Sequence, residues 1–300
     1  MGGVPLLGVD AGGTATRAVL VRDGDEVARF TDGPLNLILH ADAFDRLVSL
    51  ITKSGAAGAG LGLAGLRGSA EARALEARLR AATGIPVAVA DDTEAALLGA
   101  FDGGPGIVVI AGTGSNAFGR DADGRAARVG GYGFLLGDEG SAYSIANKAL
   151  RAALHSFDGT GPKSAALEAA VVTFYATDVD GIVRLVHGTP GDRQIVARLA
   201  ETVMALDDPV MGEILDHAAD SLAAMAAALR DRLGPGLPVA MHGGIFRDQH
   251  IRGRFVAATG AVEPAKSPEF GAVHLAAGAL TERDAEQDGV RQRDMGWAQP

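Results

Sequence analysis

The chain has 300 residues and a mass of 30.4 kDa, and its 47% hydrophobic and 21% charged residues describe a globular protein of about two domains rather than a disordered one. A net charge of −10 provides no concentrated basic surface for nucleic acid, and no stretch approaches the ~18 apolar residues of a membrane span. The absence of cysteine excludes disulfides, thiolate catalysis and cysteine-ligated metal clusters.

The first predicted strand is Pro5–Asp10, and the residues before it lack the basic region of a signal peptide, which favours a cytoplasmic protein. A glycine-rich turn leads to a second strand, Ala18–Arg22, and Asp23–Gly24 then predicts a hairpin. The string GLGLAG at residues 60–65 has the glycine spacing of a dinucleotide-binding loop. Its alternating leucines make it a strand instead, because that loop must follow a strand and open a helix.

The strand, glycine turn and strand recur later in the chain. Gly106–Ala111 is followed by the turn GTG, by Ala117–Arg120 and by a second hairpin signal at residues 121–124. A third short strand, Pro238–Met241, precedes the string HGG. The recurrence predicts an internal structural duplication in which little sequence identity remains.

Helical patterns fill the intervals between these strands, and the alternation predicts an α/β protein. Residues 284–300 are polar and unpatterned, which predicts a loose tail. The expected domains are residues 1–104 with 275–290, residues 105–274, and a tail at 291–300. The predicted helices are Ser69–Thr83, Thr93–Phe101, Ser141–His155, Gln194–Leu206, Pro209–Leu233 and Ala272–Arg283.

Both glycine turns have the composition of a phosphate cradle, because glycine lets backbone N–H donors come close to phosphate oxygens. Asp10, at the end of the first strand, is a candidate ligand for Mg²⁺, which takes one or two carboxylates and keeps most of its water. Taken singly, each turn is equally readable as a plain hairpin; the pair is the stronger signal. The cradles consist of Gly12, Gly13 and Thr14 in the first turn and Gly112, Thr113 and Gly114 in the second.

Three further segments are candidates for chemistry. Asp91 and Asp92 follow a strand and open a helix, so one of them is expected to cap that helix and the other to act as a general base. Residues 130–142, GGYGFLLGDEGSA, read as a polyol-binding loop in which Asp138 accepts hydroxyls and Tyr132 offers a ring face, or as a plain loop that caps the next helix. Gly243 and Gly244 have no side chain, so a flat base can lie against their backbone. The alternative reading is a simple turn from strand to helix.

Taken in order, these motifs resemble the BadF/BadG/BcrA/BcrD-type ATPase family, in its branch of N-acetylglucosamine and glucosamine kinases. The most specific are GTGSN and GGYGFLLGDEGSAY, and the resemblance covers roughly residues 6–280. It implies two duplicated actin-like, ribonuclease H-like ATPase domains with a cleft between them that closes on the sugar. Members of the family that activate dehydratases hold a cysteine-ligated cluster, which this chain cannot form.

The resemblance also implies roles for individual residues. Asp92 matches the catalytic base, the two glycine turns match the phosphate loops, and Gly243 with Gly244 matches the adenosine loop. Tyr132 stands where several members have tryptophan, beside the 2-substituent of the sugar, so the residue leaves the choice of sugar open. The sugar-contacting positions match Asn36, Asn116, Asp138 and Ala142.

The expected function is ATP- and Mg²⁺-dependent phosphorylation of an amino sugar at its 6-hydroxyl, with N-acetyl-D-glucosamine or glucosamine as substrate. Expected partners are ATP and the small sugar, with no nucleic acid or membrane, and the resemblance suggests a homodimer. Two alternatives stay open. One is a kinase for N-acetylmuramic acid or another sugar, whose carboxylate would need a cation such as Arg128. The other is a sensor that binds sugar and ATP without turnover.

Overall fold

The computed structural model describes residues 3–12, 15–35, 41–66, 69–189 and 192–295, without the side chains of Ser69 and of residues 283–295. Contacts divide the chain into two compact units, Met1–Gly104 with Pro264–Pro300, and Pro105–Glu263. The sequence places the return to the first domain at residue 275, whereas the first unit resumes at Pro264. The cause is local pairing, since the N–H groups of Ala265 and Lys266 donate to carbonyls of Ala100 and Gly99, each at 3.0 Å.

The first unit is built on a five-stranded sheet with the order β3-β2-β1-β4-β5. β2 is antiparallel to β1 and β3, whereas β4 is parallel to β1 and β5. The turn at residues 23–24 joins β2 to β3, as the sequence predicts. The strands are β1 (Leu6–Ala11), β2 (Thr16–Arg22), β3 (Asp25–Asp32), β4 (Gly58–Leu63) and β5 (Val87–Asp91).

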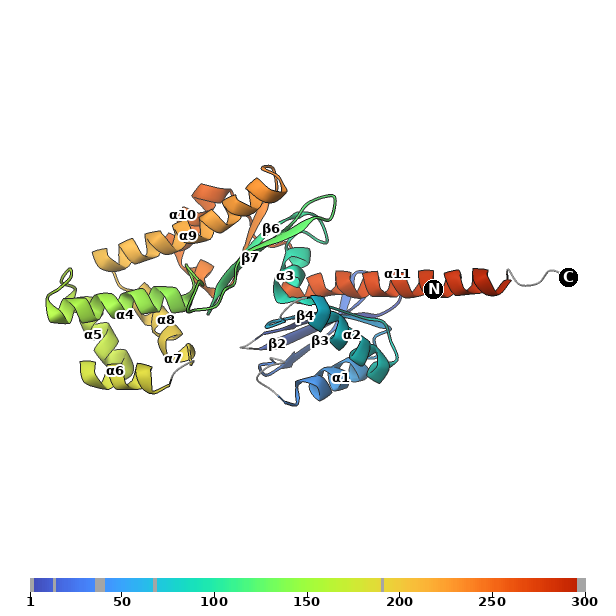
Figure 1. The fold of residues 1–300 in the computed structure, drawn as a ribbon, viewed down its shortest axis with the longest axis horizontal. Helices are drawn as coiled ribbons and strands as arrows, with labels where there is room; N and C mark the ends of the chain where they lie inside the picture. Colours follow the sequence, from blue (N-terminus) through green and yellow to red (C-terminus); the bar gives the residue numbers. More distant parts are fainter. Residues whose placement is uncertain (1–2, 13–14, 36–40, 67–68, 190–191, 296–300) are drawn as a thin grey trace. The chain divides into compact units, whose positions relative to one another are not determined.

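Helices cover both faces of this sheet (Figure 1). Because side chains alternate along a strand, Leu7, Val9 and Ala11 of β1 pack into one core with α1 and α2, while Gly8 and Asp10 face the opposite side. That side is covered by α11, which packs on β1, β4 and α3. The helices are α1 (Ala43–Ser54), α2 (Ser69–Thr83), α3 (Asp92–Ala100) and α11 (Pro268–Met295).

Glycine allows α11 to lie unusually close to the sheet. A Cβ atom at Gly8 would come within 2.0 Å of the Glu269 carbonyl oxygen, and one at Gly60 within 1.9 Å of the Ala272 carbonyl oxygen. Gly60 and Gly62 of the string GLGLAG therefore serve helix packing inside strand β4, since a Cβ atom at Gly62 would lie 2.4 Å from the Ala95 Cβ atom of α3. This explains physically why the string has dinucleotide-like spacing in a place where no nucleotide loop can form.

The second unit holds a four-stranded sheet with the order β8-β7-β6-β9, in which β6, β7 and β8 are antiparallel and β9 is parallel to β6. The helices of this unit share one large core with β6. The elements are β6 (Gly106–Ala111), β7 (Ser115–Arg120), β8 (Ala126–Gly130), α4 (Ala142–Asp158), α5 (Ala165–Tyr175), α6 (Val179–Gly188), α7 (Gln194–Ala197), α8 (Leu199–Met204), α9 (Pro209–Leu233), β9 (Val239–His242), the 3-10 turn η1 (Gly244–Arg247) and α10 (Gln249–Thr259).

Two sequence predictions about elements are wrong. The helix expected at Gln194–Leu206 is two short helices, α7 and α8, interrupted at Arg198. The tail expected from residue 284 is helical as far as Met295, because its Arg, Glu, Gln and Ala residues are good helix formers even without apolar periodicity. Helices α1, α5, α6 and α10 are additional to the predicted set.

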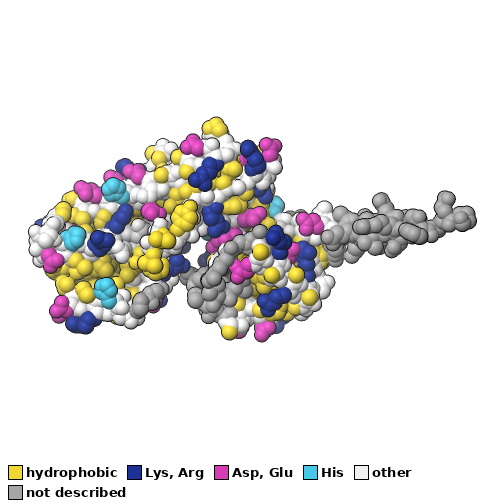
Figure 2. All heavy atoms as spheres, viewed as in Figure 1, with side chains coloured by type: hydrophobic (Ala, Val, Ile, Leu, Met, Phe, Trp, Pro, Cys, Tyr) yellow, Lys and Arg dark blue, Asp and Glu magenta, His cyan; other side chains and the backbone are white. Residues whose placement is uncertain are grey.

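No helix in the described part of the chain is long and apolar enough to cross a membrane. On the face drawn in Figure 2, the described Lys and Arg side chains are interspersed with acidic and apolar ones. No continuous basic patch forms among them there, in keeping with the net charge of the chain.

Candidate active site

The first glycine turn follows the carboxylate-bearing end of β1. Asp10 pairs with Arg17 across the hairpin, and the Gly12 N–H donates to the Ala15 carbonyl at 3.2 Å. The turn is thus closed by a backbone hydrogen bond directly after Asp10. Three residues predicted for the site, Gly13, Thr14 and Asn36, lie outside the described residues.

Asp10 lies in an electrostatically strained position on the α11 side of the sheet. Burial, together with repulsion from Glu269, raises the pKa of Asp10 to about 6, while Arg17 acts in the opposite direction. A buried carboxylate whose charge is disfavoured is a suitable partner for a cation. No group of three or more His, Cys, Asp or Glu side chains in the described chain is arranged to hold a metal. Asp10 nevertheless fits Mg²⁺, because that ion binds through one or two carboxylates and water.

The two neighbouring aspartates that follow β5 have different positions. Asp91 is the N-cap of α3, and its Oδ1 accepts from the Thr93 N–H at 2.9 Å and from the Thr93 hydroxyl. Asp92 is the first residue of the helix, where the dipole favours a negative charge. The question left open by the sequence is therefore answered, since Asp91 caps and Asp92 remains as the candidate base.

The second glycine turn rests on the start of α4. The Gly112 N–H donates to the Gly114 carbonyl at 2.9 Å, which closes the turn, and the Ala142 N–H donates to the Gly112 carbonyl at 2.8 Å. In addition, the Ser115 hydroxyl donates to the Glu139 carbonyl at 2.7 Å. The motifs GTGSN and GDEGSA, which lie apart in the sequence, therefore form one rigid structure.

Asp138 is buried at the centre of this structure, with 3% of its surface exposed. One carboxylate oxygen accepts from the Ser115 N–H at 3.3 Å, and the other lies 3.8 Å from an Arg193 nitrogen. Its φ of 62° is left-handed, a strained value that positions this side chain against the turn. A Cβ atom at Gly114 would lie 2.8 Å from the Asp138 Oδ2 atom, so only glycine leaves the carboxylate its room.

Two acceptors in this cluster have no hydrogen-bond partner among the described residues. Asp138 Oδ2 and Asn116 Oδ1 are buried side-chain oxygens without a hydrogen bond. Burial raises the pKa of Asp138, opposed by the Ser115 N–H and by Arg193. A buried acceptor without a donor is costly, which indicates that a donor belongs there. Among the predicted sugar contacts, Asn116, Asp138 and Ala142 are thus brought together.

Tyr132 lies beside this cluster, because the N–H of the preceding Gly131 donates to the Ser115 carbonyl at 3.2 Å and a Cβ atom at Gly137 would lie 3.3 Å from the Tyr132 Cβ atom. Its side chain is 73% exposed, in a loop that also carries the exposed Leu135 and Leu136. The residues that sequence reasoning missed are Ser115, Glu139 and Arg193. Ser115 lies inside the motif GTGSN and was identifiable there, whereas Arg193 lies in a segment without a motif signal.

The two glycines after β9 differ in their surroundings. Gly243 has a φ of 112°, and a Cβ atom there would come within 2.2 Å of the Ala111 carbonyl oxygen, so glycine is required for the approach to β6. Gly244, which starts η1, has no heavy atom within 4 Å of a built Cβ, and the same holds for Gly112. Open space beside both backbones fits a ligand such as ATP that must approach them.

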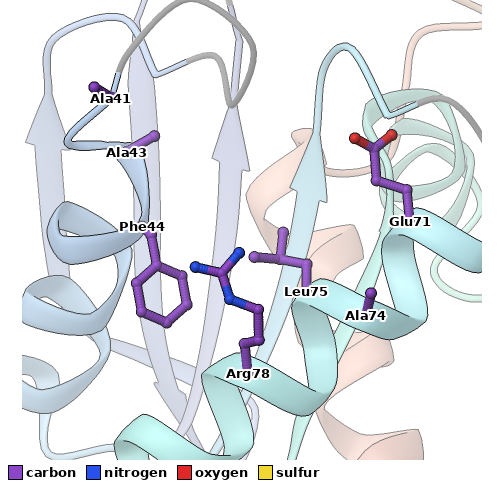
Figure 3. Close-up of a pocket in the computed structure, with 7 residues that line it drawn as sticks. All are labelled: Ala41, Ala43, Phe44, Glu71, Ala74, Leu75 and Arg78. Atoms are coloured by element: carbon purple, nitrogen blue, oxygen red, sulfur yellow. The ribbon is translucent and has the colours of Figure 1, made fainter.

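Two hollows are lined by other residues, and the second of them borders the Asp138 cluster. A pocket of about 300 Å³ lies between α1 and α2, where Arg78 stacks 4.3 Å from the Phe44 ring centroid (Figure 3). A groove of about 720 Å³ in the second unit runs between α4 and α9 and includes Glu139. None of the predicted site residues lines either hollow.

Comparisons with known proteins agree with this arrangement. An N-acetylmuramic acid/N-acetylglucosamine kinase from Clostridium acetobutylicum is 38% identical over 140 residues, which are 45% of this chain and 45% of that protein. The match thus spans about half the length of this relative. The crystal structure of a candidate N-acetylglucosamine kinase from Chromobacterium violaceum has a TM-score of 0.79 and 30% identity, covering 91% of this chain and 98% of the other.

A glucokinase of the ROK family from Streptomyces griseus shares the fold, with a TM-score of 0.58 and 17% identity over 91% of this chain and 98% of the other. These likenesses confirm the α/β class and the duplicated actin-like, ribonuclease H-like ATPase fold. The model of the BadF/BadG/BcrA/BcrD ATPase family matches residues 7–276. Because this match takes in most of the chain, the chain belongs to the BadF/BadG/BcrA/BcrD ATPase family.

Proposed function

We propose that the protein is an ATP-dependent kinase that phosphorylates N-acetyl-D-glucosamine or glucosamine at the 6-hydroxyl. Membership of an ATPase family supports the use of ATP, and the relative from Clostridium acetobutylicum is named as a kinase of N-acetylmuramic acid and N-acetylglucosamine. The observation that carries the proposal is the pair of buried acceptors without a partner, Asn116 Oδ1 and Asp138 Oδ2.

These two oxygens select the chemistry of the ligand. Each needs a donor, and sugar hydroxyls and amides donate without bringing a charge. An anionic group such as phosphate would instead meet the buried carboxylate of Asp138. A sugar that presents hydroxyl or amide donors therefore satisfies the cluster, with the N–H-rich start of α4 at Ala142 beside it.

Asp92 is the proposed general base. Its carboxylate takes the proton of the 6-hydroxyl while the sugar oxygen forms a bond to the γ-phosphorus, and the bond from that phosphorus to the ADP oxygen breaks. Asp91 is the N-cap of α3, and Asp92 follows it as the first residue of that helix. The products are the sugar 6-phosphate and ADP.

Asp10 is the proposed carboxylate for Mg²⁺, which when bound neutralises charge on the phosphates. The backbones of Gly12, Gly112 and Gly244 are proposed to lie along the nucleotide. The room beside Gly112 and Gly244 supports this assignment. The assignments of Gly13, Thr14 and Asn36 stay predictions, as do a cytoplasmic location and a homodimer.

N-acetylmuramic acid is a second candidate substrate, favoured by the name of the Clostridium relative and by one contact. Arg193 lies 3.8 Å from Asp138 Oδ2 and is 44% exposed, so its guanidinium is available to a carboxylate on a bound sugar. It replaces Arg128 in our proposal for this cation. The main-chain carbonyl of Arg128, in β8, accepts from Arg232 at 3.3 Å.

The experiment that tests the proposal is coupled ADP release with Mg·ATP and a panel of glucosamine, N-acetylglucosamine, N-acetylmuramic acid and glucose. Turnover with the N-acetylated or free amino sugar is expected. Turnover with N-acetylmuramic acid that falls in Arg193→Met, while N-acetylglucosamine turnover holds, would assign that residue to the carboxylate. ADP release independent of sugar, or sugar binding by calorimetry without ADP release, would each overturn the kinase.

A further inference from the structure

Glu269 is a buried carboxylate that the proposed reaction does not use. It lies in the first turn of α11 and is 1% exposed, although acidic side chains are rarely buried without a partner. Its backbone lies against Gly8, whose missing side chain lets the helix approach β1. Its position beside the strand that carries Asp10 is therefore fixed by close backbone packing.

The two oxygens of Glu269 are treated differently. Oε1 accepts from an Arg29 nitrogen at 2.7 Å, while Oε2 is buried and has no hydrogen-bond partner. Arg29 also binds the exposed Glu26 in a two-pronged ion pair at 2.8 and 2.9 Å. One guanidinium is thus shared between two carboxylates, and the inner carboxylate retains an oxygen to which no described residue donates a hydrogen bond.

The carboxylate to consider beside Glu269 Oε2 is that of Asp10, the proposed Mg²⁺ ligand. Gly8 and Asp10 lie on the same face of β1, and the start of α11 packs on that face at Gly8, so the Glu269 and Asp10 side chains lie on one side of the sheet. Repulsion from Glu269 contributes to the raised pKa of Asp10. The cations that face them are Arg29, which is engaged by Glu26, and Arg17, which is exposed. No hydrogen bond joins the two acids, so a shared proton does not account for the orphaned oxygen.

One buried and one half-buried carboxylate on neighbouring elements, with an unsatisfied oxygen on the buried one, match the needs of a divalent cation. Mg²⁺ and Mn²⁺ take oxygen ligands, bind through one or two carboxylates and complete their shell with water and phosphate oxygens. A cation there relieves the repulsion and supplies the missing partner of Oε2.

We propose that Glu269 is the second carboxylate of the divalent-cation site and faces, together with Asp10, the metal that accompanies the nucleotide. This inference rests on the proposed use of Mg·ATP. It goes beyond that use because it adds a residue from the far end of the chain, without any motif, to the metal site. Glu269 acts as a positioning residue for the metal and does not touch the sugar.

The test measures metal affinity rather than turnover. Mn²⁺ binding to the full protein loaded with ADP is followed by electron paramagnetic resonance, with no sugar present. Glu269→Gln keeps the shape and a hydrogen-bond acceptor for Arg29, and it is expected to weaken Mn²⁺ binding about 10- to 100-fold. Glu26→Gln is the matched control, because it alters the same arginine from the exposed side, and its Mn²⁺ affinity is expected to equal that of the wild type.

The possible outcomes separate the inference from the proposed function. Unchanged Mn²⁺ affinity in folded Glu269→Gln overturns the inference, as does an equal loss in Glu26→Gln. A wild-type protein that binds no Mn·ADP overturns the proposed function itself. If Glu269→Gln does not fold, Glu269→Asp keeps the charge but withdraws it by one methylene. A loss of Mn²⁺ affinity there, with ADP binding in excess chelator unchanged, supports the role, and wild-type affinity contradicts it.

Discussion

The two glycine hairpins that begin the two sheets have the same strand order and opposite chemistry. At the end of β1, Asp10 lies opposite Arg17, whereas at the end of β6 the corresponding pair is Ile110 and Asn116. At the pair compared, the first hairpin therefore presents charged side chains and the second presents none. The same hairpin occurs in both sheets, and the two copies differ in the residue near the end of the first strand, which is Asp10 in one and Ile110 in the other.

What packs behind each hairpin extends the contrast. The start of α11 brings Glu269 toward Asp10, so the first hairpin collects negative charge that a cation relieves. Behind the second, a loop brings Asp138 against Gly114, so buried acceptors collect that hydroxyls satisfy. The lesson is that a duplicated fold diverges through the segments that follow its repeated part, while the hairpins themselves are preserved.

The largest expected effect would test whether the first unit performs the chemistry. Asp92→Asn should lower turnover by about 10²- to 10⁴-fold, because an amide cannot accept the hydroxyl proton. Sugar affinity, measured by calorimetry, should stay close to wild type, since the buried acceptors belong to the second unit. Asp91→Asn is the matched control and should retain turnover, because asparagine caps a helix as well as aspartate. Near-normal turnover in folded Asp92→Asn would remove this residue as the base.

The aspartate pair also shows how far sequence reasoning reaches. The strand before it and the helix after it follow from the local pattern, and so does the need for one cap. Which acid caps depends on the φ and ψ angles at the junction, which a local pattern does not determine. The structure supplies that answer through the extended backbone of Asp91 and its bond to Thr93.

Long-range partners are the part that the sequence could not predict. The glycine turns, β4 and the start of α4 carry local signals, whereas Glu269 and Arg193 act on residues far away in the chain. No periodicity marks either of them. Their roles follow from the closeness that Gly8 allows and from the left-handed turn at Asp138, both of which are features of packing.

A glycine substitution would sharpen the contrast within the second hairpin. Gly114→Ala places a Cβ atom 2.8 Å from Asp138 Oδ2, so the carboxylate must move. The expected result is a loss of sugar affinity of about tenfold or more, corresponding to an overpacking cost of roughly 1–3 kcal/mol. Gly112→Ala meets no protein atom and should leave sugar affinity unchanged in calorimetry, even where ATP binding weakens. Equal sugar affinities in the two variants would contradict the placement of the sugar at Asp138.

The buried charge of the first hairpin should be visible as pH-dependent stability of the metal-free protein. The folded pKa of Asp10, about 6, exceeds its ordinary value of 3.8, so folding favours the protonated acid. The ionised Asp10 therefore lowers the free energy of unfolding increasingly as pH rises from about 4 to about 6. Above pH 6 this destabilisation reaches its full size. Asp10→Asn removes the charge and should raise the free energy of unfolding by about 2–3 kcal/mol at pH 7.

Denaturant titrations in the presence of a chelator check this sign. The difference in unfolding free energy between Asp10→Asn and wild type should shrink toward zero as pH falls to about 4. A variant that is less stable than wild type at pH 7, or a difference that does not change with pH, would show that Asp10 is not destabilised by burial. Added Mg²⁺ and ADP should stabilise the wild type and not the variant, because only the wild type retains the carboxylate.

The smallest expected effects compare the two helices that follow the binding elements. Asp91 caps α3, and Ser141 caps α4 by accepting from the Ser144 N–H at 3.1 Å. Asp91→Ala and Ser141→Ala should each lower the free energy of unfolding by about 1 kcal/mol, measured by denaturant titration.

The functional effects of the two variants should differ. Asp91→Ala removes the cap that positions Asp92, whereas Ser141→Ala removes the cap of the helix that supports the sugar cluster. Asp91→Ala should therefore reduce turnover more than sugar affinity, and Ser141→Ala the reverse. If turnover and sugar affinity changed equally in the two variants, the assignment of catalysis to the first unit and of sugar binding to the second would be contradicted.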